Sequence, residues 1–430
     1  MSFGVNIKRR GFIQRCTIAA GVLGFASRRA AADSRYVAAP GEVAAISGPG
    51  TDAPSTLADV MYWTAAGPGS RNGNSYFGNW CSGVYAPDDS TYGSLVFCNG
   101  GDADYWGNEV YKFSLDTRTW SRVSERSTGL NGQTAKNEDD PNFDTAWGEH
   151  VTPGGKVPPQ PGVPHSYDQM EYLPPRLGGG ARGAFLFPTR TIVYRYRAYK
   201  HPHIFDLSAK TWRRGSAAPG IVGIGNVDSP SWCFDSLRGR FWGIDGGASG
   251  IFITKINYLQ FDPKTRLASA HGVAIPQYLT PWGYPVSRYW RGGDLMLVAG
   301  LTRDGTAFGL WACPLATAEE RGFVALPLGG KAMPPPSQGY GFAYCGDLDC
   351  FFVRTSSAHR QKMWKITPPK SNYLASTWTV EEINMGGVTV AEKGNGQGMW
   401  KRLMYAPPLK CLIWVDDVQG PVYAYRPAGT

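Results

Sequence analysis

The chain of 430 residues carries little charge and lacks the sequence motifs of several large protein classes. Only 18% of its residues are Asp, Glu, Lys or Arg. It contains no Walker loop, dinucleotide-binding fingerprint, GxSxG elbow or HExxH motif. The usual patterns of nucleotide-binding proteins, serine hydrolases and zinc proteases are therefore excluded. No Cys-x-x-Cys pair or zinc-finger spacing of Cys and His occurs either.

Positive charge is concentrated at one end of the sequence. The net charge is +9, and six of the basic residues lie in residues 1–32, which contain no acid. Arg9 and Arg10 precede a short apolar stretch, and three alanines end at Ala32. This pattern resembles a twin-arginine export signal that is cleaved near Ala32. The apolar stretch is too short to span about 30 Å of hydrocarbon, so we expect a periplasmic or secreted protein with no stable membrane span. Nucleic acid is not expected as a partner.

The positions of the cysteines allow two bridges. Eight cysteines occur, one of them in the signal. Cys345 and Cys350 flank a hairpin, and Cys81 and Cys98 lie on two successive strands. An oxidising periplasm would permit a disulfide within each pair. The alternative is that all four are small buried hydrophobic residues.

In contrast to charged residues, glycine, proline and aromatic residues are abundant in the chain. The chain has 55 Gly and 32 Pro, and 13% of its residues are aromatic. This mixture is typical of many short strands joined by tight turns, with aromatic side chains between sheets. We therefore expect an all-β protein.

A repeat organises the chain. The stretch 108–123, NEVYKFSLDTRTWSRV, has counterparts at 202–215, 256–269, 362–380 and, more weakly, 308–326. Each copy combines an alternating strand, a polar turn and a second short strand, and a further hairpin precedes each copy. Two hairpins make a four-stranded unit of about 45–60 residues, the size of a propeller blade.

Six such units can be counted, which predicts a six-bladed β-propeller. The last unit lacks its fourth strand, and we expect Thr56–Gly67 to supply it and close the ring. A seven-bladed ring is the alternative and would need a further repeat in 124–165. The predicted organisation is a signal at 1–32, a flexible segment at 33–55 and one propeller domain at 56–430. Residues 124–165 form an irregular insertion, either a lid or a surface loop.

Residues of the first unit resemble the kelch repeat. A glycine pair, Gly100 and Gly101, is followed by Asn-Glu-Val-Tyr at 108–111, Asp116-Thr117 and Trp120. The galactose-oxidase-type propellers belong to the same superfamily. The resemblance implies that the loops between strands two and three, and those between blades, share one face that holds the binding site. We expect Trp120 to pack between blades.

These loops are rich in aromatic and polar residues, as sugar-binding surfaces are. The candidate substrate-binding residues are Asp102, Asp104, Tyr105, Trp106, His165, Trp282, Tyr340 and Arg402. His201 and His203 face the same way on an extended segment and could share a metal with a third ligand, His165 or His359. No metal ligand is assigned from the sequence. The cofactor is left unknown, with a bound divalent metal as one possibility.

The leading functional hypothesis is an exported, monomeric propeller that binds or processes carbohydrate. A polysaccharide lyase acting on acidic glycans would use His201 or His203 as base, Tyr167 as acid or base, and Arg288 as the partner of the uronate carboxylate. A hydrolase using paired carboxylates from Asp102, Asp104 or Asp228 is less favoured. A copper oxidase of the galactose-oxidase type is disfavoured because no Tyr-His step occurs. The competing class is a non-catalytic propeller that binds another protein.

Overall fold

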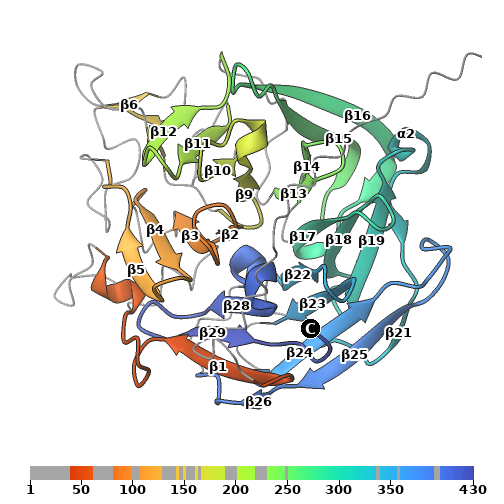
Figure 1. The fold of residues 1–430 in the computed structure, drawn as a ribbon. Coiled ribbons are helices and arrows are strands. Elements are labelled where there is room, and N and C mark those ends of the chain that lie inside the picture. The colour runs from red at the N-terminus through yellow and green to blue at the C-terminus, as the bar shows by residue number, and fades with distance from the viewer. Residues whose placement is uncertain are drawn as a thin grey trace, which may run out of the picture.

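The computed structural model describes residues 39–61, 81–98, 107–127, 142–144, 149–151, 160–162, 166–188, 201–217, 230–246, 250–335, 339–355, 359–391 and 398–430. These residues form six blades arranged in a ring around a common centre (Figure 1). Helix is limited in this part of the chain to one α-helix of four residues, α2 (Ala318–Arg321), and to short 3-10 turns. The described part of the chain has no helix with the length and apolarity needed to cross a membrane. The prediction of a six-bladed all-β propeller is confirmed.

The blades follow one another along the chain, and most contain four antiparallel strands. Blade one contains β2 (Gly83–Ala86), β3 (Ser94–Cys98), β4 (Val110–Ser114) and β5 (Thr119–Arg122). Blade two contains β9 (Glu171–Leu173), β10 (Ala184–Phe187), β11 (His203–Asp206) and β12 (Thr211–Arg214). Blade three contains β13 (Ser231–Asp235), β14 (Arg240–Ile244), β15 (Phe252–Phe261) and β16 (Ala268–Leu279).

Blade four also has four strands, whereas blades five and six each carry a short additional strand at the outer edge. Blade four contains β17 (Trp282–Trp290), β18 (Leu295–Leu301), β19 (Phe308–Pro314) and β20 (Val324–Ala325). Blade five contains β22 (Gly341–Cys345), β23 (Cys350–Arg354), β24 (Lys362–Thr367) and β25 (Trp378–Asn384), with β21 (Leu328–Gly330) parallel to β25. Blade six contains β27 (Met404–Ala406), β28 (Cys411–Val415), β29 (Val422–Tyr425), β1 (Glu42–Ser47) and β26 (Gly386–Gly387).

An N-terminal strand closes the ring, as predicted, but it is a different strand. β1 pairs antiparallel with β29 and parallel with β26. It lies upstream of the expected segment 56–67, of which Leu57–Asp59 forms a 3-10 turn and 62–67 lies outside the described residues. Val43 and Ile46 are almost fully buried in β1, so two apolar side chains among small ones are enough to seal the edge. The propeller therefore starts within the stretch predicted to be flexible.

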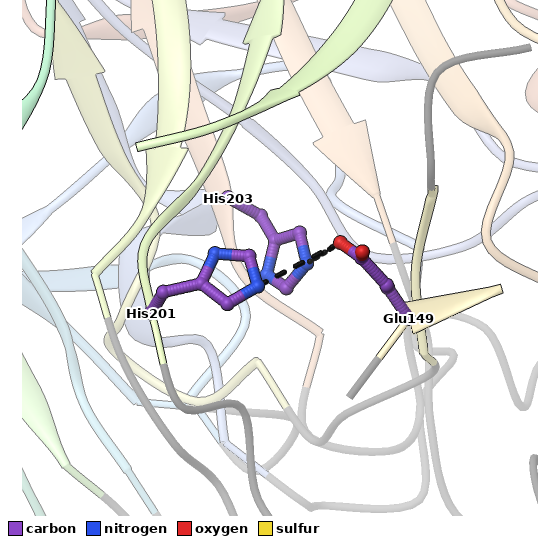
Figure 2. A group of neighbouring side chains, drawn as sticks. All are labelled: Glu149, His201 and His203. Atoms are coloured by element: carbon purple, nitrogen blue, oxygen red, sulfur yellow. Dashed lines mark ion pairs between the residues drawn. The ribbon is translucent and has the colours of Figure 1, made fainter. Parts of the chain in front are cut away.

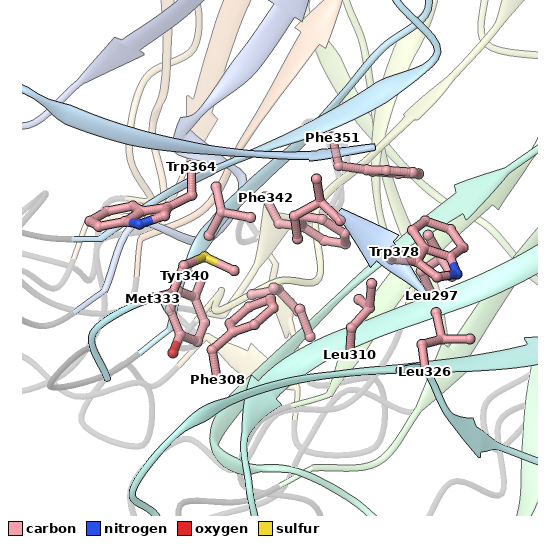
Figure 3. Packing of buried hydrophobic residues seen from close by; sticks show 14 of the residues in the cluster. Leu297, Phe308, Leu310, Leu326, Met333, Tyr340, Phe342, Phe351, Trp364 and Trp378 are labelled. Carbon is pink, nitrogen blue, oxygen red and sulfur yellow. The ribbon is translucent and has the colours of Figure 1, made fainter. Parts of the chain in front are cut away.

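Aromatic side chains from the repeats pack between blades. Trp120 lies 5.7 Å from Phe97 and 5.2 Å from Phe113, measured between ring centres. It shares an apolar cluster with Met404 and Ile413 of blade six, which confirms its predicted place between blades. Figure 3 shows the corresponding packing of blades four and five, where Trp378 joins the same apolar cluster as Leu297. The repeated tryptophan is thus part of the architecture.

The insertion between blades one and two forms a small sheet of its own. β6 (Phe143–Asp144), β7 (Glu149–His150) and β8 (Gln160–Pro161) pair in that order. Asn108, from the kelch-like motif, is buried and donates to Ser127 Oγ and to the carbonyl oxygen of Pro161, both at 2.8 Å. A motif residue of blade one therefore fastens the insertion to the propeller.

The described cysteines are all buried thiols, and no disulfide joins them. Cys345 lies directly opposite Cys350 on β22 and β23. Cys81 donates to the carbonyl oxygen of Ser82 at 3.3 Å, and Cys98 to that of Asn108 at 3.7 Å. The structure therefore matches the alternative in which these residues act as small hydrophobic side chains. Cys345 and Cys350 are nevertheless placed opposite each other, as a cross-strand disulfide would require.

Candidate functional site

The innermost strands of the six blades line a central cavity of about 380 Å³. Each of these strands carries an aromatic residue at its penultimate position, and all six residues line the cavity. The six are Tyr85, Tyr172, Phe234, Tyr289, Tyr344 and Tyr405. Because they occupy equivalent positions in equivalent strands, they surround the channel at one level. We refer to them as the aromatic ring.

Hydrogen bonds fix the tyrosines of the aromatic ring. Tyr289 and Tyr344 donate to aspartates in the turns of their own blades, Asp294 at 3.0 Å and Asp349 at 2.7 Å. Burial, together with these aspartates, raises the pKa of both tyrosines. Their hydroxyls stay protonated and occupied at neutral pH, so these tyrosines contribute mainly apolar ring surface to the cavity.

Two tyrosines of the aromatic ring link neighbouring blades. Tyr172 of blade two donates to Asp88 of blade one at 2.5 Å. Tyr405 of blade six donates to Asp347 of blade five at 2.6 Å. These contacts tie the inner hairpins of blades one and two, and of blades five and six, to each other.

A charged pair borders the aromatic ring. Lys401 donates to Glu171 at 2.5 Å and to the carbonyl oxygen of Trp232 at 2.6 Å. Burial raises the pKa of Glu171, and the neighbouring Lys401 opposes this shift. Both side chains retain a little solvent exposure, 13% for Glu171 and 8% for Lys401. They are the acid-base groups that the cavity itself supplies.

Arg288 enters the same cavity from blade four and keeps hydrogen-bonding capacity. Its Nη1 donates to Asp168 at 3.0 Å and to the carbonyl oxygen of Ser287. Asp168 is buried and also accepts bonds from Ser231 Oγ at 2.6 Å and the Ser287 amide at 2.8 Å. Within the described part of the chain, Nε and Nη2 of Arg288 donate to nothing, and the side chain is 15% exposed. A fork of donors therefore faces the channel.

The predicted histidines lie in a separate group in blade two. His201 and His203 are fully buried, with ring centres 4.3 Å apart, so they do face the same way. Their Nε2 atoms lie 3.6 Å and 3.4 Å from Oε2 of Glu149, in the inserted strand β7 (Figure 2). Burial lowers the pKa of each histidine to about 3, which leaves both rings neutral. Arg214 on β12 donates to the other oxygen, Oε1, of Glu149 at 2.8 Å.

The structure does not unite the residues proposed for a lyase. Tyr167 is buried and stacks on Tyr284, with ring centres 5.3 Å apart. Arg288 contacts Asp168 in the channel wall, whereas His201 and His203 face Glu149. With no exposed surface, the histidines cannot meet a polymer in this arrangement.

The predicted substrate-binding residues are divided between the core and the surface. Tyr340 is buried against Phe308 with ring centres 4.9 Å apart (Figure 3). Arg402 is buried and donates to the carbonyl oxygen of Val415 at 3.0 Å. Both therefore hold the fold together and are not available to a glycan. Trp282 is exposed at the start of β17 and stays a candidate.

Several candidates cannot be placed. Asp102, Asp104, Tyr105, Trp106, His165 and Asp228 lie outside the described residues, as does the segment 1–32. His359, which the sequence offered as a metal ligand, contacts Trp364 in blade five with ring centres 5.6 Å apart. The third partner of the two histidines is instead Glu149. Sequence reasoning missed it because it lies in the polar insertion, about 50 residues before the histidines.

Comparisons with known proteins add little to this description. No protein-family model matches the chain, and no curated protein matches it. A solved structure of a Bacteroides thetaiotaomicron protein of unknown function is 8% identical, with a TM-score of 0.43 over 89% of this chain and 75% of that one. An auxiliary nutrient binding protein from Bacteroides ovatus is 10% identical, with a TM-score of 0.39 over 81% and 69%.

A third solved structure, the GH43 endo-arabinanase from Bacillus licheniformis, is 13% identical, with a TM-score of 0.31 over 73% of this chain and 96% of that one. All three TM-scores are below 0.5, so these likenesses carry no argument about the present chain. Its description as a six-bladed propeller rests on its own strand order.

Proposed function

We propose that the central channel binds a small polar ligand, and that a sugar carrying a carboxylate is the ligand class that fits it. The observation that carries this proposal is the coincidence of the aromatic ring and the unused donors of Arg288 in one cavity. The apolar face of a sugar ring packs against aromatic faces. A carboxylate accepts two parallel hydrogen bonds from a guanidinium group.

The size of the cavity favours a short ligand. Its volume of about 380 Å³ lies near the lower end of the range of about 300–1,000 Å³ that is typical of small-molecule sites. A single sugar or a short oligosaccharide suits this space better than a polysaccharide chain. Carbohydrate binding is thus the part of the original hypothesis that the geometry supports best.

Chemical processing of such a ligand stays a hypothesis. If the channel contains a lyase, its carboxylate partner is Arg288, as the sequence suggested. The proton-transfer groups within reach of the cavity are Glu171 and Lys401, and not His201 or His203. A buried carboxyl group with a raised pKa is a common acid-base catalyst.

The test is a calorimetric titration of the mature chain, starting at residue 33, with a uronic acid and with its neutral parent sugar. We expect the uronic acid to bind and the neutral sugar to bind at least about tenfold more weakly. Arg288→Gln should abolish this preference, whereas Arg321→Gln, on the exposed side of α2, should preserve it. Unchanged preference in Arg288→Gln would overturn the proposal. Absence of binding by any sugar would favour the protein-binding propeller instead.

The proposed setting of this activity is outside the cytoplasm. The paired arginines, the short apolar stretch and the alanines before residue 33 support export by the twin-arginine route. We also propose that the repeats are of the kelch type, on the basis of the motif residues at 100–101, 108–111, 116–117 and 120.

A further inference from the structure

The geometry points to a buried site for a divalent transition-metal ion, formed by Glu149, His201 and His203. All three side chains are fully buried, and their potential ligand atoms lie within 4.8 Å of one another (Figure 2). The site is separate from the central channel. It lies where the inserted strand β7 meets the start of β11 in blade two.

The distances between the ligand atoms fit an ion better than direct contacts. The two Nε2 atoms lie 3.6 Å and 3.4 Å from Oε2 of Glu149, which is too long for good hydrogen bonds. Metal–nitrogen and metal–oxygen bonds of about 2.0–2.2 Å place neighbouring ligands of a tetrahedral ion about 3.3–3.6 Å apart. Both separations from Oε2 of Glu149 fall in this range, so an ion could bind between these atoms with small side-chain adjustments.

Neighbouring groups orient two of the three ligands. The Nδ1 atom of His201 lies 3.1 Å from the carbonyl oxygen of Pro202. A carbonyl oxygen only accepts, so this contact places the proton on Nδ1 and the lone pair of the neutral ring on Nε2, toward Glu149. Arg214 binds Oε1 of Glu149 and leaves Oε2 directed at the histidines. Such outer contacts are the usual means by which proteins fix metal ligands.

The donor set narrows the choice of ion. Two imidazoles and one carboxylate favour zinc and similar first-row ions over calcium and magnesium, which prefer oxygen ligands. Burial next to Arg214 adds an electrostatic cost for a dication. Because the Arg214 side chain is 34% exposed, its charge is screened by water. Three protein ligands also leave a coordination position for a water or hydroxide.

The site would join two parts of the chain. Glu149 belongs to the insertion, whereas both histidines belong to blade two. A bound ion would clamp β7 of the small sheet to blade two, in addition to the bond by which Asn108 fastens β8 to blade one. We therefore expect the metal to protect the insertion from proteolysis.

The test uses the mature chain after treatment with a chelator, titrated with Zn²⁺ by calorimetry and with Co²⁺ by absorption spectroscopy. We expect one equivalent of either ion and a cobalt spectrum typical of nitrogen and oxygen ligands. Glu149→Gln and His203→Gln should each weaken binding at least about 100-fold. The matched control is His271→Gln, an exposed histidine in blade three, which should bind like the wild type.

The proposal would be overturned if the folded wild type bound less than one equivalent of Zn²⁺ and Co²⁺. It would also be overturned if Glu149→Gln and His203→Gln bound these ions as tightly as the wild type does. If those variants do not fold, the proposal is tested by thermal unfolding and proteolysis of the wild type alone. Zn²⁺ should then raise its midpoint of thermal unfolding by a few degrees and slow cleavage of the insertion, whereas Mg²⁺ should do neither. Equal effects of the two ions would contradict the assignment.

Discussion

Arg214 binds one carboxylate oxygen of Glu149 and thereby leaves the other directed at two buried histidines. The guanidinium compensates a charge that is otherwise out of contact with water, because Glu149 has no exposed surface. Removing one partner of such a pair leaves an uncompensated charge, which is costly.

We therefore predict that Arg214→Gln lowers the free energy of unfolding by roughly 2 kcal/mol, less than for a fully buried pair because Arg214 is partly exposed. Saturating Zn²⁺ should recover much of this loss, since the ion supplies the missing positive charge. Urea unfolding with and without Zn²⁺ measures both effects, with Arg321→Gln as the surface control. A variant as stable as the wild type without metal would contradict the first expectation.

The role of the aromatic ring in sugar binding can be tested with variants that remove either a hydroxyl group alone or a whole aromatic side chain. Tyr344→Phe removes the bond to Asp349 but keeps the ring, and Asp349 still accepts from Trp290 Nε1 at 2.7 Å. We expect this variant to lose about 1 kcal/mol of stability and to keep sugar affinity. Tyr344→Leu should lower the affinity about fivefold, since aromatic stacking contributes about 1 kcal/mol. Equal affinities of the Phe and Leu variants, measured by calorimetry, would argue against stacking at this position.

The buried carboxyl group of Asp245, which follows β14, should make the free energy of unfolding depend on pH. Burial raises its pKa from 3.8 to about 7, and Lys255 opposes the shift only in part. Its Oδ1 has no hydrogen-bond partner in the described structure. A carboxyl group with a raised pKa in the folded state stabilises the fold below about pH 4, and this contribution is lost as pH rises to about 7.

Asp245→Asn should therefore be more stable than the wild type at pH 8, by at most about 4 kcal/mol for a shift of this size. The two proteins should be within about 1 kcal/mol of each other at pH 4. Chemical unfolding at both pH values measures the difference. Glu381→Gln, at a largely exposed carboxyl group, should show no comparable change between the two pH values. A constant difference for Asp245→Asn would contradict the assigned pKa.

The position of β1 predicts where the chain can be shortened. A protein that starts at residue 39 keeps β1, whereas one that starts at residue 56, the boundary expected from sequence, lacks it. Burial of Val43 and Ile46 contributes about 1.5–3 kcal/mol for each side chain. We expect the shorter protein to lose several kcal/mol or to aggregate through the exposed edge of β29. Coincident melting curves for the two proteins would show that β1 is dispensable.

Export can be tested at the paired arginines. Arg9→Lys together with Arg10→Lys should leave the full-length precursor in the cytoplasm, because the twin-arginine route reads the arginine pair itself and not its charge. Arg28→Lys with Arg29→Lys keeps the same charge near the expected cleavage region and serves as the control. Fractionation followed by immunoblotting measures the outcome. Normal export of the first variant would exclude this route.

The fold could be predicted because its signals are local and repeated. Alternating strands, polar turns and a recurring tryptophan mark each hairpin along the chain, as in 108–123 and 202–215. The closing strand could not be identified in this way. Its sequence, EVAAIS, consists mostly of small residues. The segment predicted in its place, Thr56–Gly67, contains Val60, Met61 and Tyr62 and has a higher intrinsic preference for strand. Pairing with β29, and not intrinsic preference, decides which segment closes the ring.

The candidate site was harder to predict because its parts come from different blades. The aromatic ring leaves a visible signal, since the inner strand of each blade has an aromatic residue two positions before its turn, as at Tyr85 and Tyr405. Glu149 left no such signal, because nothing local marks a glutamate in a polar insertion as the neighbour of His203. Contacts of this kind appear only when the chain is folded.

The pairing of β1 with β29 places residue 43 beside residue 425. Blade six cannot be completed until β29 has been synthesised, even though β1 is made early. β1 can therefore complete the ring only after the strands of the other five blades and β29 have been synthesised. Ring closure is therefore a late step of folding. A chain that has not yet closed would expose the unpaired edges of β1 and β29, which meet at one place in the ring.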